Sequence, residues 1–347
     1  MTQITRPRFV RIGSWLAIPV HMRGVLYVAI ASLCVVAVGV ATLSMGDLGL
    51  APHEIVQVLS GSADGPSAFV FERLRGPRLV VAIGAGAALA VAGGLFQTVT
   101  RNPLGSPDII GLTSGAGAGA AAATLLWPGV VPVPAGAAAG ALIAAGVVYV
   151  FTGNGFVSPA RVIIAGIAVA AMSVAFIQYV VLIGLRTQST ELAAFIVGSL
   201  ATRDWADAAL IWMALLVLMP MAAGLSRRLQ LIEMGDELAD ALGGKSRRTR
   251  TWSILVAVGL SAAAVSVIGP IAFVALTAPQ IAKRVTGGTG VCLMGSAVTG
   301  ALILVVADII VQRVPLVEDL PVGIVTAGIG GVYLGYLLVG EWKKGTL

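Results

Sequence analysis

The feature that most constrains this chain is a succession of apolar runs with very few charges, most of them close to 20 residues long. A helix of about that length spans the ~30 Å hydrocarbon core of a bilayer. Only 11% of the 347 residues are charged, whereas about a quarter are charged in soluble globular proteins. The 44 glycines suit a bundle whose helix backbones approach closely. The sequence therefore predicts an all-α polytopic membrane protein.

The apolar runs predict ten transmembrane helices within a single domain, residues 1–347. We expect the first to be an uncleaved helix, because its run is long enough to span and lacks a convincing cleavage site. The eighth run is too short to cross alone; Gly269-Pro270 precedes it and Pro279 lies inside it, so we expect a broken or tilted helix. The predicted spans are 24–44, 77–99, 109–127, 133–151, 161–185, 205–225, 251–268, 271–284, 291–311 and 321–340.

The distribution of positive charge supports this count. Ten spans place both termini on one side, and that side carries 16 of the 22 Lys and Arg residues. Basic residues accumulate on the cytoplasmic side of membrane proteins, so we expect both termini in the cytoplasm and no role in nucleic-acid binding. The six on the opposite side are Arg73, Arg75, Arg78, Arg186, Arg203 and Arg313.

One polar segment, residues 226–250, interrupts the apolar pattern. It contains Gly244-Lys245-Ser246, the end of a phosphate-binding loop, but Ala239 stands where that motif needs its first glycine. We therefore expect no nucleotide site. His21 and His53 are isolated, and no Ser/His/Asp or Cys/His set is visible. We predict no catalytic residues, no metal site and no enzyme activity.

We expect structural roles for two acidic residues, Asp308 and Asp108, and for several glycines. Asp308 lies near the outer end of its span, where we expect it to bond a neighbouring helix or Arg313. Asp108 follows Pro107 and is expected to cap the third span. Close helix packing is expected at the small-residue ridges Gly111/Gly115/Gly119, Gly136/Gly140 and Gly331/Gly335.

Six motifs occur in order from about residue 40 to the end of the chain. They are RGPR at 75–78, RNPLGSPD at 101–108, EMGDELADALG at 233–243, GPIAFVALTAPQIAKR at 269–284, AD at 307–308 and DLPVG at 319–323. With them the chain resembles the permease family of binding-protein-dependent ABC importers for iron–siderophore complexes, haem and vitamin B12. The resemblance implies a multi-pass subunit of the bacterial cytoplasmic membrane with ten spans.

The same resemblance implies the partners of the chain. These are a second permease subunit, identical or a sister, two ABC ATPase subunits, and a periplasmic or lipid-anchored substrate-binding protein. The chain would bind no cofactor, since ATP and Mg²⁺ belong to the ATPase subunits. Its cargo would be a ferric siderophore; haem and vitamin B12 stay open. An alternative function, a secondary transporter driven by an ion gradient, needs ionisable groups near mid-membrane, and only Asp308 comes near.

The resemblance also assigns site residues. The segment 226–250 would be an ATPase-coupling loop of two short helices, with Leu229, Ile232, Leu238 and Leu242 as an apolar face. Residues 245–250 would contact ATPase or anionic lipid. By family position, the coupling residues are Glu233, Met234, Gly235, Asp236, Leu242 and Gly243; those that dock the binding protein are Arg75, Arg78 and Arg313; and those of the cytoplasmic gate are Asn102, Leu104 and Ser158.

Overall fold

The computed structural model describes residues 8–12, 16–20, 22–46, 48–153, 159–184, 196–287, 290–315, 317 and 320–342. Each of the ten predicted spans corresponds to a helix. These are α1 (Met22–Ser44), α4 (Gly76–Thr100), α5 (Leu112–Leu126), α6 (Val133–Phe151), α7 (Pro159–Gly184), α9 (Trp205–Glu233), α11 (Ser246–Ile268), α12 (Val274–Thr286), α13 (Leu293–Arg313) and α14 (Val322–Trp342).

Shorter elements lie between and before these helices. A hairpin of β1 (Arg8–Ile12) and β2 (Leu16–Val20), which the sequence did not predict, precedes α1. The long connection after α1 folds into α2 (Pro52–Leu59), α3 (Pro66–Phe69) and a π-helical turn, η1 (Val70–Arg75). A 3-10 turn, η2 (Pro107–Ile110), precedes α5, and α10 (Asp236–Ala241) links α9 to α11.

Most of these helices have the length and the apolar composition of membrane spans. In the described part of the chain, seven are long and apolar enough to cross a bilayer, and the apolar stretches of α5 and α14 are shorter. α12 has 13 residues, contains Pro279, and follows a break at which Gly269 and Phe273 both take positive φ. The prediction of a short, interrupted eighth helix is therefore confirmed.

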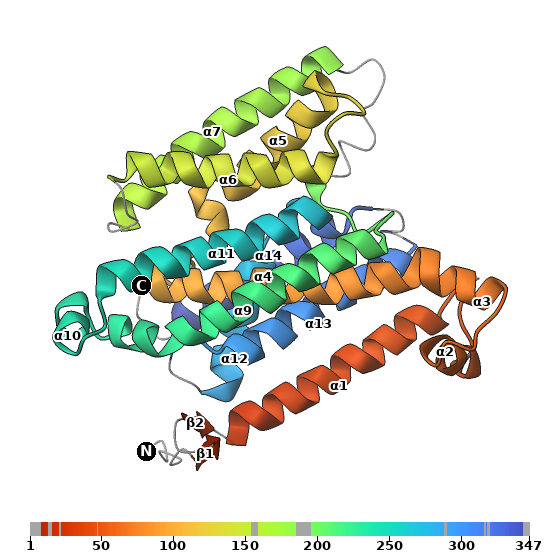
Figure 1. Cartoon of the computed structure of the whole chain (residues 1–347), viewed down its shortest axis with the longest axis horizontal. Coiled ribbons are helices and arrows are strands. Elements are labelled where there is room, and N and C mark those ends of the chain that lie inside the picture. The colour runs from red at the N-terminus through yellow and green to blue at the C-terminus, as the bar shows by residue number, and fades with distance from the viewer. Residues whose placement is uncertain are drawn as a thin grey trace.

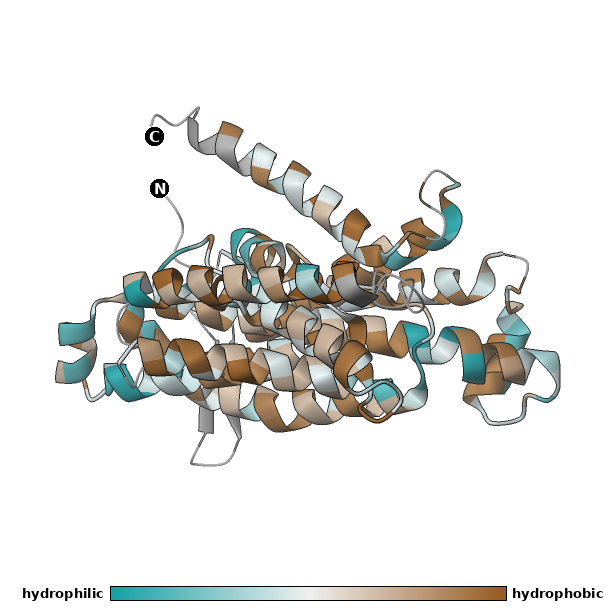
Figure 2. Cartoon of the chain, turned by 90° about the horizontal axis from the view of Figure 1, so that it is seen from above, coloured by the Kyte–Doolittle hydropathy of each residue, from teal (hydrophilic) through white to brown (hydrophobic). Residues whose placement is uncertain are grey.

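The helices form a main bundle with a smaller layer beside it. Figure 1 shows α5, α6 and α7 together on one side, above the bundle of α4, α9, α11, α12 and α13, while α1 runs along the opposite edge. α10 stands at one end of the long axis, and α2 with α3 stands at the other. Figure 2 shows hydrophobic residues along the helix bodies, hydrophilic ones gathered toward the two ends, and α14 leaning away from the bundle.

The first and last long helices have their outer ends on the same side of the molecule. α1 begins and α14 ends toward the end of the molecule that carries α10 (Figures 1 and 2). This agrees with an even number of crossings. The assignment of that end to the cytoplasm stays a prediction, which rests on the charge distribution.

α4 is the centre of the bundle. Its buried positions run around the whole helix from Val81 to Val99, and it packs against α9, α11, α12 and α13. Glycines bring these backbones together: a Cβ on Gly93 would overlap the carbonyl oxygen of Ala275 in α12, and one on Gly86 would overlap that of Gly300 in α13. No larger residue fits at these two points without moving a helix.

The predicted small-residue ridges divide into two groups. Gly115 and Gly119 of α5 face Gly136 and Gly140 of α6 so closely that a Cβ at any of them would meet the backbone of the other helix. Close packing is confirmed there. Gly331 and Gly335 of α14 meet nothing within 4 Å in the described chain, so close packing at this ridge stays a prediction.

We predict that Gly93→Ala destabilises the protein. The added methyl group must displace α12 from α4, and overpacking of this kind costs about 1–3 kcal/mol. Thermal unfolding of the detergent-solubilised chain should show a lower midpoint. Gly224→Ala is the matched control, because Gly224 of α9 has open space around it and alanine favours a helix; its midpoint should not fall. Equal midpoints for the two variants would contradict the close contact.

Candidate functional site

The three arginines predicted for binding-protein docking come together at the α2/α3 end of the molecule. Arg75 ends η1, Arg78 lies in the first turn of α4, and Arg313 ends α13. All three line one pocket of about 250 Å³, which also includes Ser199–Ala201 and Gln312. We call this the arginine pocket. Four regions of the chain build it: residues 75–78, 199–201, 311–313 and 320–322.

Asp308 is held by Arg78. The Arg78 guanidinium donates from Nε and Nη2 to Oδ1 of Asp308, at 2.9 and 2.7 Å, and Gln312 Nε2 donates to Oδ2 at 2.7 Å. The Asp308 side chain is 1% exposed, so these donors replace the water that it lacks. The predicted bond to a neighbouring helix is therefore confirmed, since Arg78 belongs to α4. The alternative partner, Arg313, was wrong: a residue five places on has turned about 140° around the helix, whereas Gln312, at four places, shares the face of Asp308.

Arg75 and Arg313 both bond the end of α1. Arg75 Nη1 donates to the carbonyl oxygens of Thr42, Leu43 and Met45 at 2.8, 3.0 and 2.7 Å, and Arg313 Nη2 also donates to Met45. Positive groups at the C-terminus of a helix satisfy its last carbonyls and its dipole. Each arginine of the pocket therefore has a structural contact in addition to any role in docking.

At the opposite end, the predicted coupling loop is smaller than the sequence suggested. α9 continues without a break to Glu233, so residues 226–233 extend a span instead of forming a separate short helix. Met234 and Gly235 make the turn into α10, and Leu242–Lys245 make the turn into α11. Gly235 and Gly243 have φ of 119° and 78°, so the prediction that these glycines permit tight turns is confirmed.

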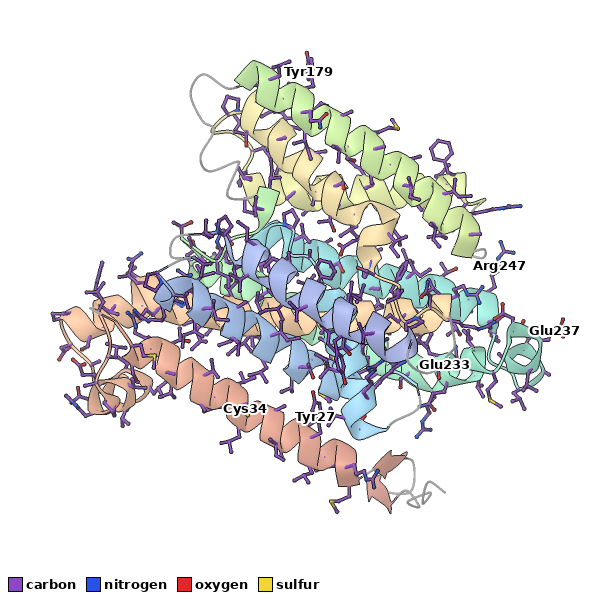
Figure 3. The ribbon with its side chains drawn as sticks, turned by 180° about the vertical axis from the view of Figure 1, so that it is seen from behind. Tyr27, Cys34, Tyr179, Glu233, Glu237 and Arg247 are labelled. Carbon is purple, nitrogen blue, oxygen red and sulfur yellow. The ribbon has the colours of Figure 1, made fainter. Side chains whose placement is uncertain are left out.

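The expected apolar face of this segment also needs correction. Leu229 and Ile232 are fully buried in the bundle core, because α9 carries them into it. The apolar side chains that reach the surface are those of Met234, Leu238 and Leu242, which are 63%, 44% and 58% exposed. We call residues 234–243 the docking segment. Figure 3 places Glu233, Glu237 and Arg247 at this same end of the molecule.

The root of the docking segment is bonded to three helices. Asp236 accepts from Arg101 at the end of α4 and from Arg250 Nη2 of α11, at 2.9 and 3.1 Å for its two oxygens. Arg101 Nε also donates to the carbonyl oxygen of Ile232 at 2.9 Å. Lys283 Nζ of α12 lies 3.6 Å from Glu233 Oε1. Sequence reasoning missed this arrangement, since residues 101, 236 and 250 share no local pattern.

The predicted gate residues lie directly beside Arg101. Asn102 Oδ1 accepts from the backbone N–H of Leu104 at 2.9 Å, which closes a turn in which both side chains are exposed. Gln280 of α12 donates to the carbonyl oxygen of Pro103 at 3.1 Å. Ser158, the third predicted gate residue, lies outside the described residues. The structure thus joins Asn102 and Leu104 to the docking segment through Arg101.

The basic flank divides into a buried and an exposed part. Thr249 and Arg250 are buried and Arg250 bonds Asp236, so lipid contact was a wrong prediction for these two residues. Lys245, Arg247 and Arg248 are exposed and line a cavity of about 440 Å³ with Trp252. Their contact with anionic lipid or ATPase stays a prediction. Asp240 caps α11 by accepting from Ser246, and these bonds lower the pKa of its carboxyl.

Asp108 does not cap a helix in the way that the sequence suggested. Ser106 is the N-cap of η2, and its hydroxyl accepts from the N–H of Asp108. The Asp108 carboxylate accepts from the hydroxyls of Ser106 and Thr113, and α5 begins after Gly111 in the left-handed conformation. The Asp108 carboxylate therefore reaches the first turn of α5 through the Thr113 hydroxyl.

The described residues contain no group of three His, Cys, Asp or Glu side chains that could hold a metal ion. Cys34 and Cys292 are both free thiols. Among the described residues, the arginine pocket and the ion-paired docking segment are organised polar sites at opposite ends of the helical bundle. Such an arrangement defines a multi-pass membrane protein with an organised polar site at each end.

Comparisons with known proteins place the chain within that class. The profile of the FecCD transport family matches residues 33–340, and the chain belongs to this family. It is 37% identical to the ferric enterobactin transport system permease protein FepG of Escherichia coli over 90% of this chain and 95% of that protein. It is 36% identical to the Fe(3+)-citrate import system permease protein YfmE of Bacillus subtilis, over 93% and 97% of the two chains.

A solved structure shares the fold. A metal-chelate type ABC transporter in an inward-facing conformation superposes with a TM-score of 0.80 and covers 90% of this chain and 98% of its own, at 24% identity. The expected family and the polytopic helical fold are thus confirmed, as is the placement of the chain as a multi-pass protein of the cytoplasmic membrane.

Proposed function

We propose that this chain is the membrane subunit of a binding-protein-dependent ABC importer that carries ferric siderophores into the cytoplasm. Membership of the FecCD transport family supports this most directly, because relatives at 36–37% identity are named for ferric enterobactin and Fe(3+)-citrate transport. The chain would act with a second permease subunit, identical or a sister. ATP and Mg²⁺ would bind the separate ATPase subunits, and this chain would bind no cofactor.

The docking segment is the proposed contact with the ATPase. Met234, Leu238 and Leu242 expose apolar surface at the end of the bundle that the charge distribution assigns to the cytoplasm. A short helix with apolar side chains on one face fits a hydrophobic groove on a partner. Gly235 and Gly243 hold the segment at a sharp angle to α9 and α11 through their positive φ.

The arginine pocket is the proposed contact with the binding protein. Asp308 forms an ion pair with Arg78. Arg75 and Arg313 bond only backbone carbonyls within the described chain, so no carboxylate of that part of the chain pairs with them. Acidic side chains of a partner would approach these two guanidinium groups. Such charges steer the encounter and fix its orientation more than they add affinity.

An ion-gradient-driven transporter is the competing function. It requires ionisable groups near mid-membrane that take up and release the coupling ion. Asp308, the candidate carboxylate, is paired with Arg78 and bonded to Gln312 at the pocket end of α13, which fits a fixed structural bond better. Haem and vitamin B12 remain alternative cargoes of the same family fold.

We predict that Gly235→Arg abolishes ATPase association and iron uptake while the protein stays in the membrane. A φ of 119° is strained for any residue with a Cβ, and the new side chain projects from the proposed contact. Co-purification of the ATPase and ⁵⁵Fe uptake in cells measure the two effects. Gly224→Ala, in open space on α9, is the control. Uptake at the normal rate in Gly235→Arg would refute ATPase docking at this segment.

We predict that Arg313→Gln slows association with the binding protein several-fold and weakens its salt dependence, because one steering charge is lost. Surface plasmon resonance on the detergent-solubilised transporter measures both quantities. Arg73→Gln removes the same charge from an exposed position outside the pocket and should change the rate little. Equal rates for both variants would show that the pocket is not the docking site.

We predict that a strain lacking this chain loses growth on one class of ferric siderophore. The test supplies a panel of siderophores, ferric citrate, haem and vitamin B12 as nutrient sources, with complementation by the intact chain. An unchanged iron phenotype, together with a defect on haem or vitamin B12, would overturn the cargo assignment. Uptake that survives ATP depletion but stops when the proton gradient collapses would favour the secondary transporter.

A further inference from the structure

Ion pairs fix the root of the docking segment to three helices of the bundle. Asp236, its first helical residue, is bonded at once to the end of α4 and to α11, and Glu233 just before it is paired with α12. We propose that the Arg101–Asp236 ion pair, braced by Arg250, transmits movement of the docking segment to the inner gate. Arg101 and Asp236 are then positioning residues for transport, a role that rests on the proposed function.

Arg250 fixes one side of this contact. Its side chain is only 7% exposed, while that of Asp236 is 44% exposed. A buried guanidinium is costly unless an anion accepts its bonds, and Nη2 donates to both oxygens of Asp236. Because the bonds of Arg250 come from the first turns of a largely buried helix, Asp236 cannot shift without either moving α11 or breaking them.

Arg101 forms the other side and leads to the gate. It is the C-cap of α4 in the left-handed conformation, and its guanidinium forks between Asp236 and the carbonyl oxygen of Ile232. Two different nitrogens of one rigid plane make these bonds, which a lysine cannot reproduce. The next residues are Asn102 to Leu104, the gate turn. The Arg101 side chain therefore links the docking segment directly to the gate turn.

α12 connects to the same turn independently. Gln280 Nε2 donates to the carbonyl oxygen of Pro103 at 3.1 Å and to Gln97 Oε1 of α4 at 2.8 Å, while Gln97 Nε2 donates to the carbonyl oxygen of Leu276 at 2.9 Å. Lys283, almost one turn further along α12, faces Glu233. The gate turn thus lies between two helices, each of which has a charged contact with the root of the docking segment.

These contacts could stabilise the fold or transmit movement to the gate. The two roles predict different effects of a mutation on ATPase binding, ATP hydrolysis and gate movement. If the ion pair only stabilises the fold, its loss lowers assembly, ATP hydrolysis and gate movement together. If it transmits movement, its loss leaves the ATPase bound and active while the gate stops responding to nucleotide. Arg101→Gln is the primary variant, because it leaves Arg250 with its acceptor; Asp236→Asn is the second.

The experiment uses the whole transporter, with its ATPase, partner permease and binding protein, in proteoliposomes. A cysteine replaces Leu104, which is 50% exposed in the gate turn, in a background with Cys34→Ser and Cys292→Ser. The maleimide labelling rate of that cysteine is measured with and without ATP and vanadate, beside ATPase co-purification and ATP hydrolysis. These measurements need no knowledge of the cargo.

We expect the nucleotide-dependent change in labelling rate to fall about tenfold in Arg101→Gln, with ATPase association and hydrolysis within about twofold of the parent. The double variant Arg101→Gln/Asp236→Asn should lose no more than Asp236→Asn alone, because both changes break one contact. Arg228→Gln removes the same charge as Arg101→Gln from an exposed position of α9 outside the docking segment, and should retain the full change in labelling.

Two results would overturn the inference. One is a labelling change in Arg101→Gln that equals that of the parent; the other is a loss of ATPase association and hydrolysis in proportion to the loss of gate response. Failure of the parent complex itself to bind its ATPase would instead refute the proposed function, and the inference with it. The parent and the variants therefore distinguish the two failures.

Discussion

The close approach of helix backbones around α4 is the constraint on which the rest of the structure depends. At Gly93 and Gly86 the backbones of α12 and α13 occupy the space that a side chain would fill. Van der Waals packing and interhelical hydrogen bonds, not the hydrophobic effect, hold helices together within a bilayer. Because α4 is fixed on several sides, its two ends are fixed as well, and both organised sites are built on those ends.

The polar contacts follow from that placement. Arg78, in the first turn of α4, reaches Asp308, and Arg101, just past its last turn, reaches Asp236. Both carboxylates belong to distant parts of the sequence, and both have a second donor, Gln312 or Arg250. One rigid helix therefore carries an ion pair at each end, which links the side proposed for binding-protein docking to the side proposed for ATPase docking.

The sequence predicted the residue types of the two sites better than their contacts. The three arginines predicted as a group do line one pocket, but for Asp308 the sequence left a neighbouring helix and Arg313 open, and only the structure names Arg78 of α4. Leu229 and Ile232 were placed on a docking face because the resemblance assigns residues 226–250 to a coupling loop and helical periodicity puts the two on one face of it. Periodicity shows that residues share a face, but it does not show whether that face meets the core or a partner; the length of α9 decided that question.

What the sequence determined by itself is the class of protein, the ten apolar segments that form long helices, and the family. Long apolar runs form helices, because the bilayer core offers backbone groups no hydrogen-bond partners other than one another. The family follows from the six motifs, which occur in the same order as in its members. The tertiary structure decided which residues 130 to 230 positions apart are bonded, including Arg101 with Asp236 and Arg78 with Asp308. Those pairings depend on helix contacts across the bundle, which no local pattern in the sequence records.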